Sequence, residues 1–227
     1  MNTTPPAKFQ QPGAAQAGGY TLTLAGVLVA AGLVFHPLPA RGFREVPSVL
    51  ENTPWWGAIH VAIAAGFVLC VLGGLLTLIG GGIATRRWVN ALGWGALTVG
   101  MIYFTGVALI NGWVLHELAH RAGQETALYE AMNDLIIGFG WLGNPLFLLG
   151  LTGVAFQEMR SGALGMRRWI ARLGFAAAVL SWGRGVGSAT GLYFLEPLIF
   201  ANIPAFLWLG YYGWLMAQAA RVENAAA

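Results

Sequence analysis

Two pairs of potential metal ligands, each four residues apart, lie in residues 113–134, which read WVLHELAHRAGQETALYEAMND. His116 and His120 share one face of a continuous helix, because residues four apart are neighbours on a helix surface. Glu130 and Asp134 repeat this spacing after a short break. If the apolar segments on either side form an antiparallel hairpin, two imidazoles can face two carboxylates. Such a set of nitrogen and oxygen ligands suits a metal ion.

The pentapeptide HELAH at residues 116–120 matches the HExxH pattern and resembles the zinc-binding helix of zinc metallopeptidases. The resemblance implies that the two histidines bind zinc and that Glu117 acts as the catalytic base on a zinc-bound water. The longer metzincin pattern is not complete, because Thr126 stands where that family has its third histidine. A gluzincin-like arrangement instead takes Glu130 as the third ligand and Asp134 as a partner for a histidine. This resemblance predicts a zinc-dependent hydrolase acting on peptide or lipid at the membrane surface.

The composition predicts that these residues belong to an all-α integral membrane protein. Of the 227 residues, 57% are hydrophobic and only 9% are charged, whereas soluble domains carry about 25% charged residues. Runs of roughly 20 apolar residues are long enough to cross a bilayer, and six such runs are expected. The expected spans are residues 20–35, 55–80, 89–115, 135–156, 174–194 and 198–220. We therefore expect a disordered N-terminal tail (1–19), a bundle of six transmembrane helices (20–221) and a short C-terminal tail (222–227).

The distribution of lysine and arginine predicts that both termini are cytoplasmic in a multi-pass protein of the cytoplasmic (inner) membrane. Most basic residues fall in the N-terminal tail, in loops 81–90 and 157–173, and at the C-terminus. This orientation places all four histidines at the extracytoplasmic end, although they belong to three different helices. The four are His36, His60, His116 and His120.

A second interpretation of the histidines is a haem or a transition-metal ion held between helices. Imidazoles at one depth on neighbouring helices can be axial ligands of a b-type haem, and His60 opposite His116 or His120 would provide them. Addition of His36 and a carboxylate would suit copper, zinc or iron instead. No CxxCH motif is present, so covalently attached c-type haem is excluded.

Arg184 is the most deeply placed ionisable residue of the expected spans. A charge at that depth costs roughly 2.5–3.5 kcal/mol on insertion scales and normally has a partner. We expect Arg184 to bind a haem propionate or a quinone oxygen, or to pair with Glu196, Glu130 or Asp134. These residues favour a redox function, either electron transfer or oxidation of a lipophilic substrate such as a quinol.

A third hypothesis is a non-catalytic membrane subunit of a larger complex, or a homo-oligomer, since glycine-rich helices favour close association in the bilayer. The basic residues lie in short loops, so nucleic-acid binding is not expected. The only cysteine, Cys70, lies within an apolar run and cannot form an internal disulfide.

Overall fold

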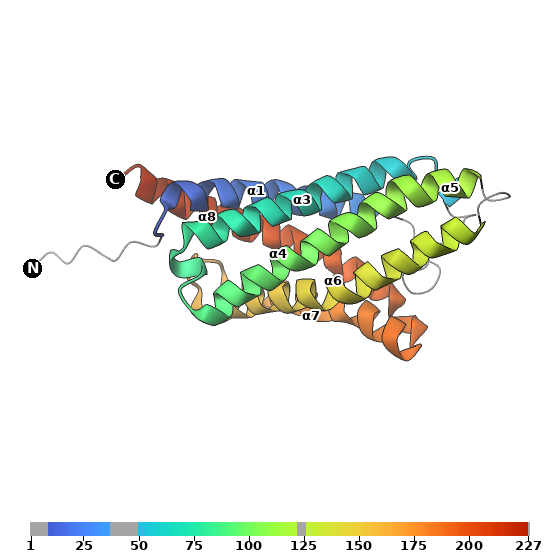
Figure 1. Cartoon of the computed structure of the whole chain (residues 1–227). Helices are drawn as coiled ribbons and strands as arrows, with labels where there is room; N and C mark the ends of the chain where they lie inside the picture. The colour runs from blue at the N-terminus through green and yellow to red at the C-terminus, as the bar shows by residue number, and fades with distance from the viewer. Residues whose placement is uncertain (1–8, 37–49, 122–125, 227) are drawn as a thin grey trace, which may run out of the picture.

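The computed structural model describes residues 9–36, 50–121 and 126–226, and every regular element in these ranges is helical (Figure 1). Six helices are long: α1 (Pro12–Phe35), α3 (Trp56–Gly80), α4 (Trp88–Leu109), α6 (Thr126–Ser161), α7 (Arg168–Thr190) and α8 (Asn202–Asn224). The shorter elements are the 3₁₀ helix η1 (Gly82–Ala84), the π-helix η2 (Ile110–Leu115), α5 (His116–His120) and the 3₁₀ helix η3 (Tyr193–Ala201).

Five helical stretches in the described part of the chain are long and apolar enough to cross a membrane. They are residues 12–35, 56–80, 88–120, 127–161 and 194–224. Helix α7 is the exception among the long helices, and it carries Arg168, Arg172 and Arg184. The predicted all-helical class is confirmed for the described residues, and these stretches are consistent with a multi-pass membrane protein.

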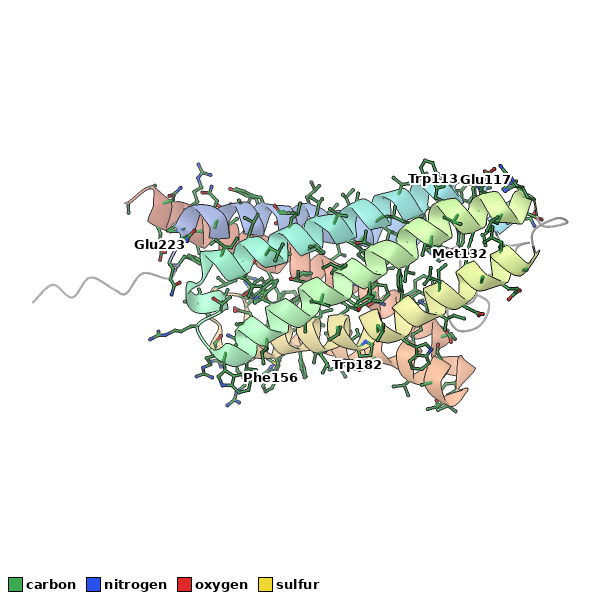
Figure 2. All side chains as sticks on the ribbon, in the orientation of Figure 1. Trp113, Glu117, Met132, Phe156, Trp182 and Glu223 are labelled. Carbon is green, nitrogen blue, oxygen red and sulfur yellow. The ribbon has the colours of Figure 1, made fainter. Side chains whose placement is uncertain are left out.

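The long helices form one elongated bundle in which α1 packs against α3 and α8, and α4 packs against α3 and α6 (Figure 1). Helix α1 begins, and α8 ends, at the same end of this bundle, here called the terminal end. There the Phe9 backbone N–H donates to Glu223 Oε2 at 3.1 Å. The opposite end, where α1 ends and α3 begins, is called the histidine end. Figure 2 shows Glu223 at the terminal end and Glu117 at the histidine end.

Helix α1 begins at Pro12, eight residues before the expected start at Tyr20. Proline is well suited to the first helical position because its missing N–H would have no partner there. Gly18 and Gly19 then allow close packing, since a Cβ on Gly19 would lie 2.5 Å from the Gly213 carbonyl oxygen of α8. Residues 12–19 therefore extend the first helix. Residues 1–8 of the expected tail lie outside the described residues.

Glycines also bring α4 and α6 into direct backbone contact. A Cβ on Gly150 would overlap the backbone nitrogen of Leu97 and lie 2.6 Å from the Gly93 carbonyl oxygen. A Cβ on Gly100 would overlap the backbone nitrogen of Phe147. Small residues thus allow the close approach that stabilises helix pairs where lipid provides no hydrophobic driving force.

Candidate functional site

A cavity of about 110 Å³ lies between the helices, towards the histidine end. One water needs roughly 10–15 Å³ of such space, so the cavity can hold several waters or a small organic group. Its polar lining consists of His36, His60, Asn111, Asn144, Ser181, Arg184 and Asn202, which come from six different elements. Three of the predicted ligand-binding residues, His36, His60 and Arg184, therefore share one cavity.

His36 and His60 form a direct contact at one wall of this cavity. Their Nε2 atoms are 3.2 Å apart, and the ring centroids are 4.9 Å apart. His60 is only 4% exposed, and its Nδ1 lies 2.9 Å from the Trp56 carbonyl oxygen one turn earlier in α3. A carbonyl oxygen can only accept, so His60 Nδ1 carries the hydrogen. The Nε2 atom of His60 is therefore a lone-pair acceptor that faces His36.

Trp56 holds both imidazoles in place. Its ring centroid lies 5.1 Å from that of His36 and 4.5 Å from that of His60. The indole is fully buried, and its Nε1–H donates to the Asn111 carbonyl oxygen at 3.0 Å. Asn111 belongs to η2, and π-helical segments are frequent at functional sites. In the same segment Gly112 leaves room for the His60 side chain, which a Cβ on Gly112 would overlap.

The wall further from the histidine end is aromatic. Four cavity-lining phenylalanines, one each from α3, α4, α6 and α8, form a closed ring of contacts that we call the Phe quartet: Phe67, Phe104, Phe147 and Phe206. Neighbouring ring centroids are 5.4 to 6.0 Å apart. The inner part of the cavity is therefore aromatic, and the rest of its lining carries the polar side chains among aliphatic ones.

Arg184 lies on the α7 side of the cavity and forms an ion pair with Glu196 of η3. Arg184 Nε is 3.4 Å from Glu196 Oε2, and the side chains are 16% and 8% exposed. Ser188 donates from Oγ to Glu196 Oε1 at 3.0 Å. Glu196 is one of the partners expected for Arg184 from the sequence. Arg184 is therefore a charged group at the cavity, and the carboxylate of Glu196 is its counter-charge.

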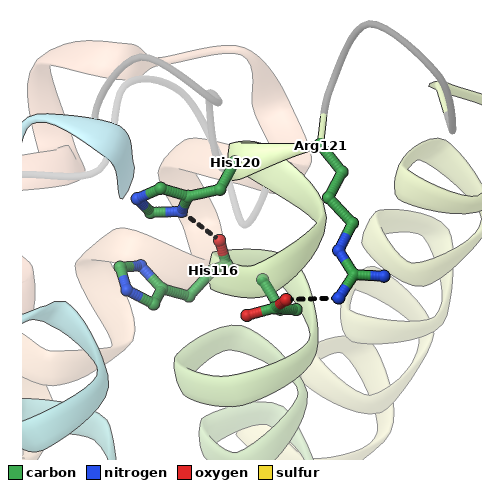
Figure 3. Close-up of polar contacts among 4 residues, drawn as sticks. His116, His120 and Arg121 are labelled. Carbon is green, nitrogen blue, oxygen red and sulfur yellow. Dashed lines mark hydrogen bonds and ion pairs between the residues drawn. The ribbon is translucent and has the colours of Figure 1, made fainter.

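The HELAH residues form α5, which continues α4 and η2 without a break and ends this helical stretch (Figure 3). The rings of His116 and His120 lie side by side on one face, with centroids 4.7 Å apart, and His120 Nδ1 is 2.8 Å from the His116 carbonyl oxygen. Glu117 instead accepts from Arg121 Nη2 at 2.6 Å, and their side chains are 61% and 58% exposed. Arg121 leaves the helix on the side away from the imidazoles (Figure 3). A base that activates zinc-bound water must lie beside the metal, whereas Glu117 pairs here with Arg121 at the exposed surface.

The predicted ligands thus occupy separate places. His36 pairs with His60, His116 pairs with His120, and Glu130 and Asp134 are exposed on α6. Within the described ranges, no group of three or more His, Cys, Asp or Glu side chains is placed to hold a metal ion. The side chain of Thr126, at the third-histidine position of the metzincin pattern, lies outside the described residues.

Several cavity residues were not singled out from the sequence. Asn111, Asn144, Ser181 and Asn202 lie within or beside apolar spans, where an amide or hydroxyl needs a hydrogen-bond partner. Asn202 donates from Nδ2 to the Ile199 carbonyl oxygen at 3.0 Å, whereas its buried Oδ1 accepts no hydrogen bond from any described residue. Asparagines inside predicted spans were therefore an available signal for this cavity.

Comparisons with protein families, curated proteins and solved structures gave no match to this chain.

Proposed function

We propose that this chain is a multi-pass membrane protein that binds a lipophilic, oxygen-bearing ring compound of the quinone class in the cavity between its helices. The observation that carries the proposal is the division of the cavity into the aromatic Phe quartet and a part that carries the polar side chains. Small-molecule sites are mostly apolar with a few polar groups that fix the orientation of the ligand. A quinone ring matches this division, because its ring is apolar and its oxygens accept hydrogen bonds.

The positions of the polar residues also favour a ring with oxygens on opposite edges. His36 and His60 belong to α1 and α3, which lie along one side of the bundle (Figure 1). Asn144 and Arg184 belong to α6 and α7, which lie along the other side. A para-quinone between these walls would accept hydrogen bonds at both edges, and its reduced form would donate to them. A redox function of the chain follows from this class of ligand.

The proposal includes six membrane crossings and cytoplasmic termini in the cytoplasmic membrane. Helix α7 is the sixth long helix and lies with the others in the bundle. With six crossings, an even number, the chain ends on the side of the membrane where it began, which is the terminal end. The loops at this end hold Arg86, Arg87, Arg160 and Arg167, and basic loops favour the cytoplasmic side. The histidine end would then be extracytoplasmic.

Ligand binding can be measured with a short-chain quinone and the purified protein in detergent, by quenching of tryptophan fluorescence. Ala108 lines the cavity and is 3% exposed, so Ala108→Leu should fill part of it. Ala65 is exposed on α3, and Ala65→Leu is the matched control. We expect Ala108→Leu to weaken binding at least tenfold and Ala65→Leu to leave it unchanged. Absence of saturable binding, or equal binding by both variants, would refute the proposal.

The other candidate functions have weaker support. Glu117 pairs with Arg121 at the exposed surface, which gives no support to its role as a general base beside the two histidines. Glu117→Gln should therefore not change any hydrolysis that the purified protein shows. Two axial haem ligands lie on opposite sides of the iron, about 4 Å apart at metal–nitrogen distances near 2.0–2.1 Å. The ligands expected from the sequence, His60 with His116 or His120, are instead paired differently, since His60 contacts His36 and His116 contacts His120. The 3.2 Å between the Nε2 atoms of His36 and His60 is also too short for axial ligation by that pair.

A further inference from the structure

We propose that His36 and His60 bind one divalent transition-metal ion of the zinc or copper type through their Nε2 atoms, at the polar part of the cavity. The proposal goes beyond quinone binding, because it depends on the two imidazoles and not on the nature of any organic ligand.

The distance between the two nitrogens fits a shared ion. With Nε2 atoms 3.2 Å apart and bonds of 2.0–2.1 Å, the two ligands subtend an angle of about 100° at the metal. This value is close to the tetrahedral angle that zinc prefers in proteins. For both Nε2 atoms to present lone pairs to an ion, the hydrogen on His36 Nε2 must move to its Nδ1, so that His36 stays neutral as the other tautomer.

The second ring nitrogen of His60 is placed as in known metal sites. Metal-binding histidines almost always donate their other ring N–H to a carbonyl, a carboxylate or a water, which fixes the ring orientation. His60 Nδ1 donates to the Trp56 carbonyl oxygen at 2.9 Å, so Nε2 is the atom available for a metal. Neutral imidazole suits zinc, copper and nickel better than hard ions such as Mg²⁺.

The surrounding packing holds the two histidines, which belong to different helices, at a fixed separation. Gly32 of α1 and Gly66 of α3 allow the two helices to touch, since a Cβ on Gly32 would overlap Ile63 Cγ1 and a Cβ on Gly66 would lie 2.5 Å from Val29 Cγ2. Trp56 stacks beside both rings. Pre-organisation of this kind lowers the free-energy cost of ordering ligands when a metal binds.

The cavity leaves room for the remaining ligands of the ion. Two protein ligands leave coordination positions for water or for an oxygen of a bound molecule, as in metal sites that keep an open position. This incomplete protein ligand set predicts moderate affinity and exchange of the other ligands. An oxygen of a cavity-bound ring compound would be a suitable additional ligand.

The test is equilibrium dialysis of chelator-treated, detergent-purified full-length protein against Zn²⁺, with Co²⁺ absorption in the visible range as a second readout. We expect one Zn²⁺ per chain, bound with moderate affinity. His36→Gln, at the partly exposed end of α1, should weaken this binding at least a hundredfold and remove the Co²⁺ spectrum. His60→Gln should do the same, and His36→Gln alone decides the outcome if the buried His60 variant does not fold.

The second histidine pair provides the matched control. The double variant His116→Gln/His120→Gln removes two imidazoles from the same end of the bundle, one more than either test variant, and should keep the Zn²⁺ site. Unchanged Zn²⁺ affinity in His36→Gln, or loss of the site only in the His116/His120 variant, would overturn the proposal. The quinone-binding experiment with Ala65→Leu and Ala108→Leu is independent of this metal-binding experiment. The quinone proposal and the metal proposal can therefore fail separately.

Discussion

The hydrogen bond from Trp56 to the π-helix provides a quantitative test of how the site is held together. Trp56→Phe keeps an aromatic ring beside His36 and His60 but removes the Nε1–H that donates to the Asn111 carbonyl oxygen at 3.0 Å. The Asn111 carbonyl lies inside the π-helix, so the loss of this one hydrogen bond costs about 0.5–1.5 kcal/mol. The smaller ring also buries less apolar surface, by an amount equivalent to one or two CH₂ groups, and this loss lowers the free energy of unfolding by about 1–2 kcal/mol.

The expected loss in the free energy of unfolding is therefore about 1.5–3.5 kcal/mol. It can be measured by SDS titration of the detergent-purified protein, followed by circular dichroism. Trp113 lies on the same π-helix but is 71% exposed, so Trp113→Phe is a matched control with an expected change within about 0.5 kcal/mol. A loss below about 1 kcal/mol for Trp56→Phe, or equal losses for both variants, would show that this bond does not stabilise the site.

The remaining predictions concern the bundle around the cavity. Removal of one partner of a buried ion pair costs about 3–5 kcal/mol, whereas an exposed pair contributes less than about 1 kcal/mol. Arg184→Gln should therefore destabilise the protein strongly in an SDS titration, whereas Arg121→Gln, which removes the exposed pair with Glu117, should have little effect. Equal small effects of the two variants would contradict the burial of the Arg184–Glu196 pair. Gly150→Ala should lower the free energy of unfolding by about 1–3 kcal/mol, because the methyl group overpacks the α4–α6 contact. Gly153 has nothing within 4 Å of its Cβ position, so Gly153→Ala should raise the free energy of unfolding by about 0.5–1 kcal/mol. A larger loss for Gly153→Ala than for Gly150→Ala would refute the packing. Cys70 is fully buried, so a maleimide should label it only after denaturation, and rapid labelling of native protein would show that α3 faces solvent or lipid there.

The class of fold was predictable because crossing a bilayer imposes a length and a composition that can be read directly. The start of α1 was not, because residues 12–19 are rich in Ala and Gly and lack a strongly apolar run. Their helix is stabilised by packing of Gly18 against α3 and Gly19 against α8. These contacts depend on the tertiary arrangement, which cannot be predicted from helix propensity alone.

The site was predictable in its residues but not in its pairing. The sequence favoured His60 opposite His116 or His120, whereas the structure places His36 beside His60. The direction of a side chain depends on the rotation of its helix, and each residue added to a helix turns the next side chain by about 100°. The π-helix at residues 110–115 changes this rotation just before HELAH, and no residue type in INGWVL marks it in advance.

The Phe quartet has a consequence for permeation through the bundle. Its four rings come from α3, α4, α6 and α8 and touch in a closed circuit, with centroids at most 6.0 Å apart. A hydrated ion moving past them would lose its water without receiving any polar replacement, which is costly in an apolar surrounding. We therefore expect the quartet to be a hydrophobic barrier to ions. Solutes that enter from the histidine end would have to leave by the same route. Expression of the protein should not make a membrane conduct ions.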